Sequence, residues 1–312
     1  MLKFKRKVLL AKIEGTYAVD SVPVAATDAV LVRNLRVRPL RLGYERRELA
    51  KTFYANEGDI VTGQWSEIEF DLEIAGAGTA VDTVAKYGPL LRGCGIAQTV
   101  NAAVSVQYDP VSSGEESLSI YFQIDGRQHK LLGCRGSRFG FTIRAGAVPY
   151  YHFSFIGLHV QPTDAALTPG TFTGFQKPLS VNNANTTPFT LHTFAGKLRE
   201  FTFDAGLQTA YRNLVGSESV VITGRTPTGR ITLESELVAT KDWWTIVKAM
   251  TAGALTLTHG TVAANKVKFD APNAQLTEPD DSGEEDGVSM LTMGLNFIPG
   301  AGGNDEFRIT TL

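Results

Sequence analysis

Alternation of apolar and polar residues dominates this chain and predicts a protein built mainly of β-strands. The clearest example is WSEIEFDLEI (65–74), in which four apolar residues alternate with four acids. Successive side chains of a strand point to opposite faces, so the apolar set is expected to face a core. The opposite face would carry Glu67, Glu69, Asp71 and Glu73. Because like charges at this spacing repel one another mildly, such an acidic face calls for a functional reason.

Two hairpins are also predicted. LSIYFQIDGRQHKLLG (118–133) reads as two strands around Asp125-Gly126, a pair suited to a tight turn with positive φ, and LTLTHGTVAANKVKFD (255–270) has the same form. Helical periodicity is short and occurs twice. Its apolar positions are Val81, Val84 and Leu91, interrupted by Gly88-Pro89, and then Trp243, Ile246, Val247 and Met250. The fold class expected is all-β with minor α.

A proline-rich stretch divides the chain. Residues 161–188, QPTDAALTPGTFTGFQKPLSVNNANTTP, contain four prolines among Gly, Thr and Asn and keep no regular period. We interpret this stretch as an extended connector. The predicted domains are therefore residues 1–160 and 189–312.

The two halves resemble each other in the order of their segments. Ile60-Val61-Thr62-Gly63 and the strand WSEIEFDLEI in the first half correspond to Val221-Ile222-Thr223-Gly224 and RITLESEL in the second, and a short helical pattern follows each strand. In RITLESEL the polar face again carries acids, Glu234 and Glu236. The shared order predicts a duplicated domain.

Bulk composition is that of a globular protein, with 43% hydrophobic and 20% charged residues in a chain of 312. The net charge of −2 gives no overall attraction to nucleic acid or to an anionic membrane. No apolar run approaches the roughly 20 residues that span a bilayer, and the basic start MLKFKRK precedes too short an apolar stretch for a secretory signal. We expect a cytosolic amino terminus and no membrane partner.

Catalytic chemistry finds little support in the sequence. The five histidines show no metal-ligand spacing, and no nucleophile elbow, phosphate loop or dinucleotide motif is present. The acidic row could supply a carboxylate pair, but a wet strand face does not raise the pKa of an acid as glycoside hydrolysis requires. Cys94 and Cys134 are expected to be buried and reduced. No catalytic residue, metal or cofactor is predicted.

Two charged segments remain. RNLRVRPLRLGYERREL (33–49) is rich in arginine, which pairs well with carboxylates or phosphate on another surface, although a solvated β arm is an equal alternative. Its candidate contact residues are Arg36, Arg38, Arg41, Arg46 and Arg47. EPDDSGEEDG (278–287) is expected to be an acidic loop.

Several stretches together resemble the major tail tube proteins of long-tailed, non-contractile bacteriophages, in their duplicated two-domain form. They are AKIEGTYAVDSVPVAATDAVLVRNLRVRPL, IVTGQWSEIEFDLEIAG with YGPLLRGCG, NNANTTPFTLH, and VVITGRTPTGRITLESELVATKDWW, and they cover nearly the whole chain. The resemblance implies tail-tube-type β-sandwich domains, each with a flanking helix, whose inner sheets join into one β-barrel in an assembled ring. Stacked rings would form the conduit for genomic DNA.

The resemblance also implies a location and partners. The protein would be part of the virion tail, assembled in the host cytoplasm, with a tape measure protein and a tail terminator as partners. Because a basic lining would grip DNA phosphates, the row from Glu67 to Glu73, with Glu234 and Glu236, is predicted to line the lumen. Double-stranded DNA would pass without specific binding. Two domains per chain predict a ring of three chains with approximate sixfold symmetry, and the arginine arm is predicted to contact an adjacent ring.

Alternatives are a carbohydrate-binding or capsid-decorating β-sandwich, and a tube protein like that of type VI secretion. For the acidic row, the alternative is an ordinary solvated outer strand face.

Overall fold

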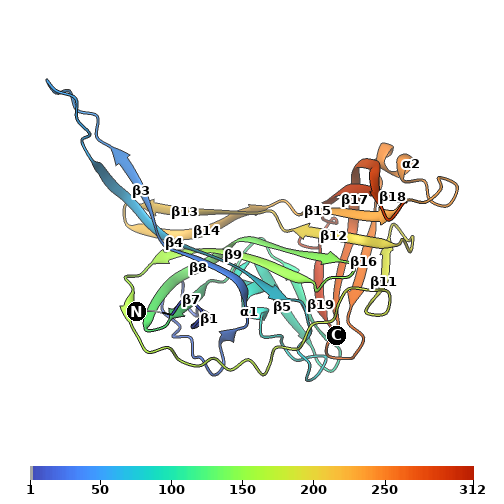
Figure 1. Cartoon of the computed structure of the whole chain (residues 1–312), viewed down its shortest axis with the longest axis horizontal. Helices are drawn as coiled ribbons and strands as arrows, with labels where there is room; N and C mark the ends of the chain where they lie inside the picture. Colours follow the sequence, from blue (N-terminus) through green and yellow to red (C-terminus); the bar gives the residue numbers. More distant parts are fainter. Residues whose placement is uncertain (1–2) are drawn as a thin grey trace.

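Antiparallel strands make up slightly more than half of the chain in the computed structural model, which describes residues 3–312 (Figure 1). The first half contains β1 (Lys7–Ile13), β2 (Ala29–Val30), β3 (Arg33–Arg46), β4 (Asp59–Glu73), α1 (Gly88–Gly93), β5 (Ile96–Asn101), β6 (Ser105–Pro110), β7 (Leu118–Ile124), β8 (Arg127–Arg144) and β9 (Tyr150–His159). The second half contains β10 (Thr163–Asp164), β11 (Thr186–Leu191), β12 (Leu198–Asp204), β13 (Leu207–Leu214), β14 (Ser217–Arg225), β15 (Thr228–Glu234), α2 (Trp243–Lys248), β16 (Ala252–His259), β17 (Val267–Glu285), β18 (Val288–Phe297) and β19 (Arg308–Thr311). The predicted fold class, all-β with minor α, is confirmed.

Strand order is the same in the two halves. Neighbouring strands of the first half follow β1–β7–β8–β9–β4–β3. Those of the second half follow β11–β16–β17–β18–β15–β12. Both predicted hairpins are present, β7–β8 around Asp125-Gly126 and β16–β17, and both turn residues of the first have positive φ.

The two halves join edge to edge. The last part of β8 pairs with β12, so that Arg144 faces Glu200 and Phe141 faces Phe203, and β19 pairs with β6 at a second junction. We call the β8–β12 pairing the internal seam. Beneath it lies a buried aromatic cluster of Phe139, Phe141, Phe201, Phe203, Phe269, Phe297 and Phe307. One apolar core therefore extends through both halves.

Each half carries one long hairpin. The outer part of β3–β4 projects away from it, and we call residues 41–64 the arm (Figure 1). In the second half, β13–β14 occupies the matching position in the chain but packs on the first half. Tyr211 stacks on Trp65 with ring centroids 5.1 Å apart, and Asn213 Nδ2 donates to the Thr62 carbonyl at 3.0 Å.

Two sequence interpretations need correction. Gly88-Pro89 does not interrupt the first helix but begins it, since a proline in the first helical turn loses no hydrogen bond there. The acidic stretch 278–287 is not mainly a loop, because β17 continues to Glu285 and pairs with β18. Its pairing is interrupted by two bulges, whose extra residues weaken the alternation that would have identified a strand.

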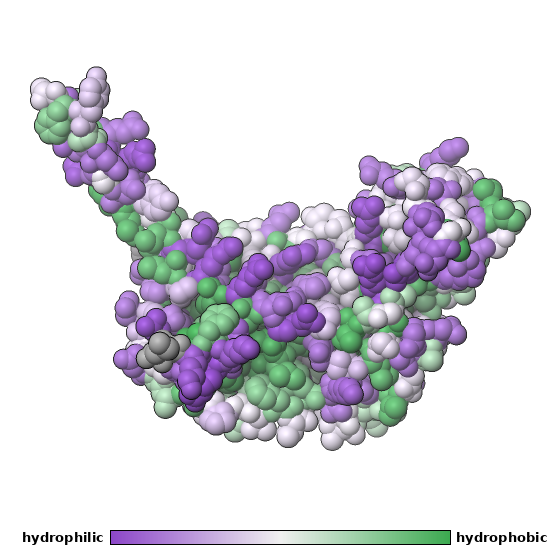
Figure 2. All heavy atoms as spheres, in the orientation of Figure 1, coloured by the Kyte–Doolittle hydropathy of each residue, from purple (hydrophilic) through white to green (hydrophobic). Residues whose placement is uncertain are grey.

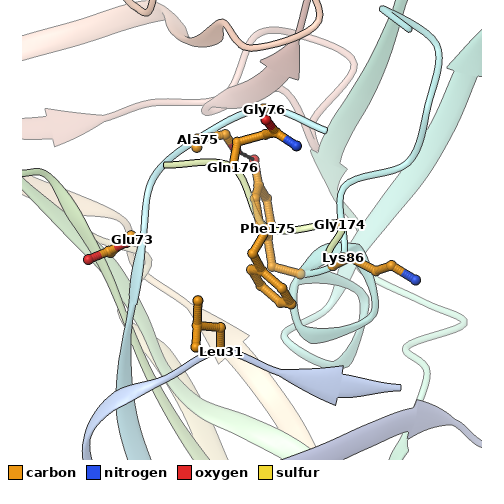
Figure 3. Close-up of a pocket in the computed structure, with 9 residues that line it drawn as sticks. Leu31, Glu73, Ala75, Gly76, Lys86, Gly174, Phe175 and Gln176 are labelled. Carbon is orange, nitrogen blue, oxygen red and sulfur yellow. Dashed lines mark hydrogen bonds between the residues drawn. The ribbon is translucent and has the colours of Figure 1, made fainter. Parts of the chain in front are cut away.

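Residues 161–185 lie along one side of the body, and β11 begins at Thr186 (Figure 1). Besides the short β10, the connector places Phe175 beside Leu31 and Gln176 over Gly76, close to the segment that precedes α1 (Figure 3). A side chain at Gly174 would collide with Lys86, so the chain passes closely there. The connector is thus packed against the first half.

Candidate lining and assembly surfaces

The acidic row lies on β4 as the alternation predicted. Ile68, Phe70 and Leu72 are at most 2% exposed, while the acids between them lie on the opposite, partly exposed face. That face is continued by alternate residues of β3 and β9. The core packs against only one side of this sheet, so the polar side remains available to line a cavity or to contact another molecule.

Arginines of β3 pair with these acids across the strands. Arg38 Nη1 lies 3.0 Å from Glu67 Oε2, Arg41 Nε lies 3.3 Å from Glu67 Oε1, and Arg36 Nη1 lies 3.4 Å from Glu69 Oε1. The sequence had placed the acids and the arginines in two separate sites. The structure brings them together on one face.

His152 is a member of this face that sequence reasoning missed. Its Nδ1 lies 2.7 Å from Asp71 Oδ1 and its Nε2 lies 3.0 Å from Thr142 Oγ1, so it connects β4 with β8. Its position in the alternating segment YYHFSF was the signal that could have placed it on the polar face. Asn34 Nδ2 also donates to Asp71, at 2.6 Å.

The same face crosses the internal seam. Arg138 Nε lies 3.1 Å from Asp204 Oδ2, and Arg144 Nε lies 3.7 Å from Glu200 Oε2. On β15, Glu234 pairs with Lys197. Glu236 lies beyond the end of that strand, 3.8 Å from the same lysine, so it is not on a strand face as the sequence suggested.

We call this surface the charged face. Its ionisable residues are Arg36, Arg38, Glu67, Glu69, Asp71, Glu73, Arg138, Arg144, His152, Glu200, Asp204, Arg230 and Glu234. Positive and negative side chains alternate between neighbouring strands. The face is therefore built of cross-strand ion pairs rather than of acids alone.

Glu67 is held by hydrogen bonds and ion pairs from Trp65, Arg38 and Arg41. Burial raises its pKa, but hydrogen bonds from Trp65 and Arg38 and the charges of Arg41 and Arg38 outweigh that effect, so the pKa of Glu67 is lowered. Trp65 Nε1 donates to Glu67 Oε1 at 2.9 Å. The carboxylate therefore stays ionised to a lower pH than an ordinary glutamate does.

The arm presents a different surface. Phe53 is 64% exposed and Tyr54 is fully exposed near its tip. Arg46 Nε lies 3.9 Å from Asp59, and Arg47 forms no ion pair with any residue from 3 to 312. Of the five candidate contact arginines, Arg36, Arg38, Arg41 and Arg46 each have an acid of the chain within ion-pairing distance, and Arg47 has none among residues 3–312.

The rest of the described chain adds no competing site. Within residues 3–312 no cluster of His, Cys, Asp and Glu could hold a metal ion, and no helix is long and apolar enough to cross a membrane. Cys94 and Cys134 are buried, as predicted, and burial raises the pKa of both thiols.

A family model described as "Phage tail tube protein" matches residues 5–294. The chain belongs to that family. No curated protein matches it. Tail tube proteins are structural components of the phage tail, so the predicted structural role is confirmed and replaces the alternatives. In this tail tube protein, the charged face and the arm are the two candidate surfaces for lining and for assembly.

Proposed function

We propose that this tail tube protein assembles into rings of three chains and that the charged face lines their lumen. The observation that carries this proposal is the internal seam, where two groups of strands with the same order form one continuous sheet. A single chain thereby supplies two successive segments of a curved wall. We attribute the repeated order to duplication of one tube domain, with 1–160 and 189–312 as the two copies.

Ring closure follows from the strand edges that a single chain leaves open. Within residues 3–312, β3 pairs only with β4, and β17 beyond Leu276 pairs only with β18. Open edges pair with other strands, and a closed ring removes them. Six tube domains around the ring correspond to three chains, with exact threefold and approximate sixfold symmetry.

The lining explains why acids are needed in the tube. A cation that reaches DNA phosphates releases counterions and adds affinity, so unpaired arginines in the lumen would slow the duplex. Here Glu67 and Glu69 neutralise the arginines beside them. We propose that these acids, with Asp71, Glu73 and Glu234, keep the lining from holding DNA during ejection.

The tip of the arm is proposed to reach an adjacent ring, with Arg46 and Arg47 as its charged contacts and Phe53 and Tyr54 as its apolar ones. Arginine pairs well with carboxylates across such an interface. Rings would then stack in the host cytoplasm, with a tape measure protein and a tail terminator as further partners.

Electron microscopy of the purified protein tests this function. Hollow tubes of stacked rings are expected, and their appearance should not require any other tail component. A protein that stays monomeric at high concentration, or forms only filled aggregates, would contradict the proposal.

A further inference from the structure

We infer that the free edge of β3 in one copy pairs with the free half of β17 in the next copy, with Arg33–Arg38 opposite Asp280–Glu285. This inference rests on the ring proposed above and names the residues that close it. It follows from the internal seam, which shows how the same two kinds of strand meet within one chain.

Strand β3 of the first half corresponds to β12 of the second. The repeated stretches IVTG and VITG end at Gly63 and Gly224. Glu69 and Arg230 each lie six residues after these glycines, so they occupy the same place in the repeat. Arg36 lies opposite Glu69, and Thr202 lies opposite Arg230. Arg36 on β3 therefore takes the place of Thr202 on β12.

Strand β17 of the second half corresponds to β8 of the first. Phe153 and Met293 are equivalent because they pair with Phe70 and Ile231, which occupy the same place in the repeat. Counting three residues back gives Tyr150 and Met290. Their partners are Thr142 on β8 and Gly283 on β17.

The internal seam pairs Thr202 with Thr142 and Asp204 with Gly140. The same register between two copies places Arg36 opposite Gly283 and Arg38 opposite Asp280. Because bulges shift the pairing of β17 by one residue, Ser282 lies next to Gly283 on the same edge.

The charges on the two strand edges support the pairing of β3 with β17. The β3 edge carries Arg33, Arg36 and Arg38, while the β17 edge carries Asp280, Asp281, Glu284 and Glu285. The Arg36 and Arg38 side chains remain 80% and 61% exposed, although each has a partner on β4. Two β3 edges would repel each other, as would two β17 edges, so the charges favour a head-to-tail contact that can close a ring.

An apolar contact at the base of the arm points to the same neighbour. Inside the chain, Ile222 of β14 packs next to Gly95, where an added Cβ would lie 3.4 Å from Ile222 Cδ1. The matching residue of the arm is Val61, which is 57% exposed. Gly95 comes two residues after the end of α1, and Met250 comes two residues after the end of α2. Met250 also has positive φ, and its side chain is 54% exposed.

Val61 and Met250 thus form two halves of an apolar contact that the single chain does not make. In the proposed ring, Val61 of one copy covers Met250 of the next, as Ile222 covers Gly95 within the chain. A second copy would therefore pair with the free strand edges, match their charges and cover the exposed apolar residues.

Disulfide trapping tests the seam. Arg36→Cys is combined in turn with Ser282→Cys and Gly283→Cys, and assembled tubes are oxidised mildly and run on a non-reducing denaturing gel. Cys94 and Cys134 are buried and should not react. We expect a covalent ladder that ends at the trimer, because a closed ring of three chains leaves no free end.

Arg36→Cys with Ser113→Cys is the matched control, since Ser113 is exposed on a loop outside the seam, and it should give no ladder. If replacing Arg36 prevents assembly, Val61→Cys with Met250→Cys tests the same neighbour without changing charge. If the wild-type protein forms tubes but no seam pair cross-links more than the control, the proposed seam is wrong and the tube function still holds. Failure of the wild-type protein to form tubes would overturn both.

Discussion

Arg144 and Glu200 lie opposite each other where the two halves of the chain meet, with Arg144 Nε 3.7 Å from Glu200 Oε2. The pair belongs to the charged face, and the backbones that carry it form a regular antiparallel ladder. Such a ladder makes the junction part of the sheet rather than a loose contact between domains. The pairing of β6 with β19 joins the two halves at a second place.

Phe203→Ala should destabilise both halves together. Phe203 is 3% exposed and its ring centroid lies 4.8 Å from that of Phe307 and 5.2 Å from that of Phe141. Loss of this ring should lower the free energy of unfolding by about 3–5 kcal/mol. Chemical denaturation of the unassembled protein, followed by intrinsic fluorescence and circular dichroism, measures the effect.

Phe53→Ala is the matched control, because Phe53 is 64% exposed on the arm. Its effect on the stability of the single chain should stay within about 0.5 kcal/mol. A comparable loss from both variants, or unfolding of Phe203→Ala in two separate steps, would contradict a shared core.

Replacement of Glu67, Glu69, Asp71 and Glu73 by lysine should give tubes that retain DNA. The strand keeps its polar face, but the new cations stand beside Arg36 and Arg38, so the lining becomes strongly basic. Particles that carry this variant should eject slowly, and the delay should shrink as salt rises. Ejection measured by dye release reports the rate.

The corresponding Gln variant, with Asp71→Asn, removes the negative charges without adding positive ones and should have an intermediate effect. Normal ejection of the lysine variant at low salt would mean that these acids do not line the lumen.

Alanine at Arg46 and Arg47 should yield folded rings that stack poorly, because the arm loses the cations proposed to contact the next ring. The loss should be greater at high salt, where the remaining charge contacts are screened. Tube yield by sedimentation measures stacking, and Arg127→Ala, on the distant β7–β8 turn, serves as the control. Equal yields from the double variant and the control would count against the arm.

Glu67 gives the charged face a defined dependence on pH. Its pKa lies below the ordinary value of 4.5, so its ion pairs stabilise the fold fully above that pH, and the stabilisation is lost as the pH falls through the lowered pKa. Glu67→Gln should therefore be less stable than the wild type near neutral pH, by up to about 1 kcal/mol, with the difference vanishing in strong acid. Thermal unfolding across the acidic range measures it, and a difference that grows on acidification would refute the assignment.

Local pattern was enough to predict the strands but not their neighbours. The alternation around Phe70 and the Asp125-Gly126 turn depend on nearby residues, and both are confirmed. Pairing of Arg38 with Glu67 depends on how β3 lies against β4, and the bulges in β3 prevent a simple count from giving that register. For this reason the sequence separated two charged sets that share one face.

The internal seam was beyond sequence reasoning for the same physical cause. Strands β8 and β12 are separated by β9 and the connector, and nothing in the local pattern of Phe141 or Phe203 specifies the other as its partner. Their burial is predictable, but which buried residues meet is decided by the packing of the whole sheet. The edge of β17 was missed because its bulges made a strand look like an acidic loop.

The number of chains per ring tests the account most directly. A reconstruction of purified tubes by electron cryomicroscopy, computed without imposed rotational symmetry, counts them. We predict three chains per ring, with the two halves of each chain alternating around the lumen and their charged faces turned inward. Six identical chains per ring, with only one half of each lining the lumen, would contradict the account.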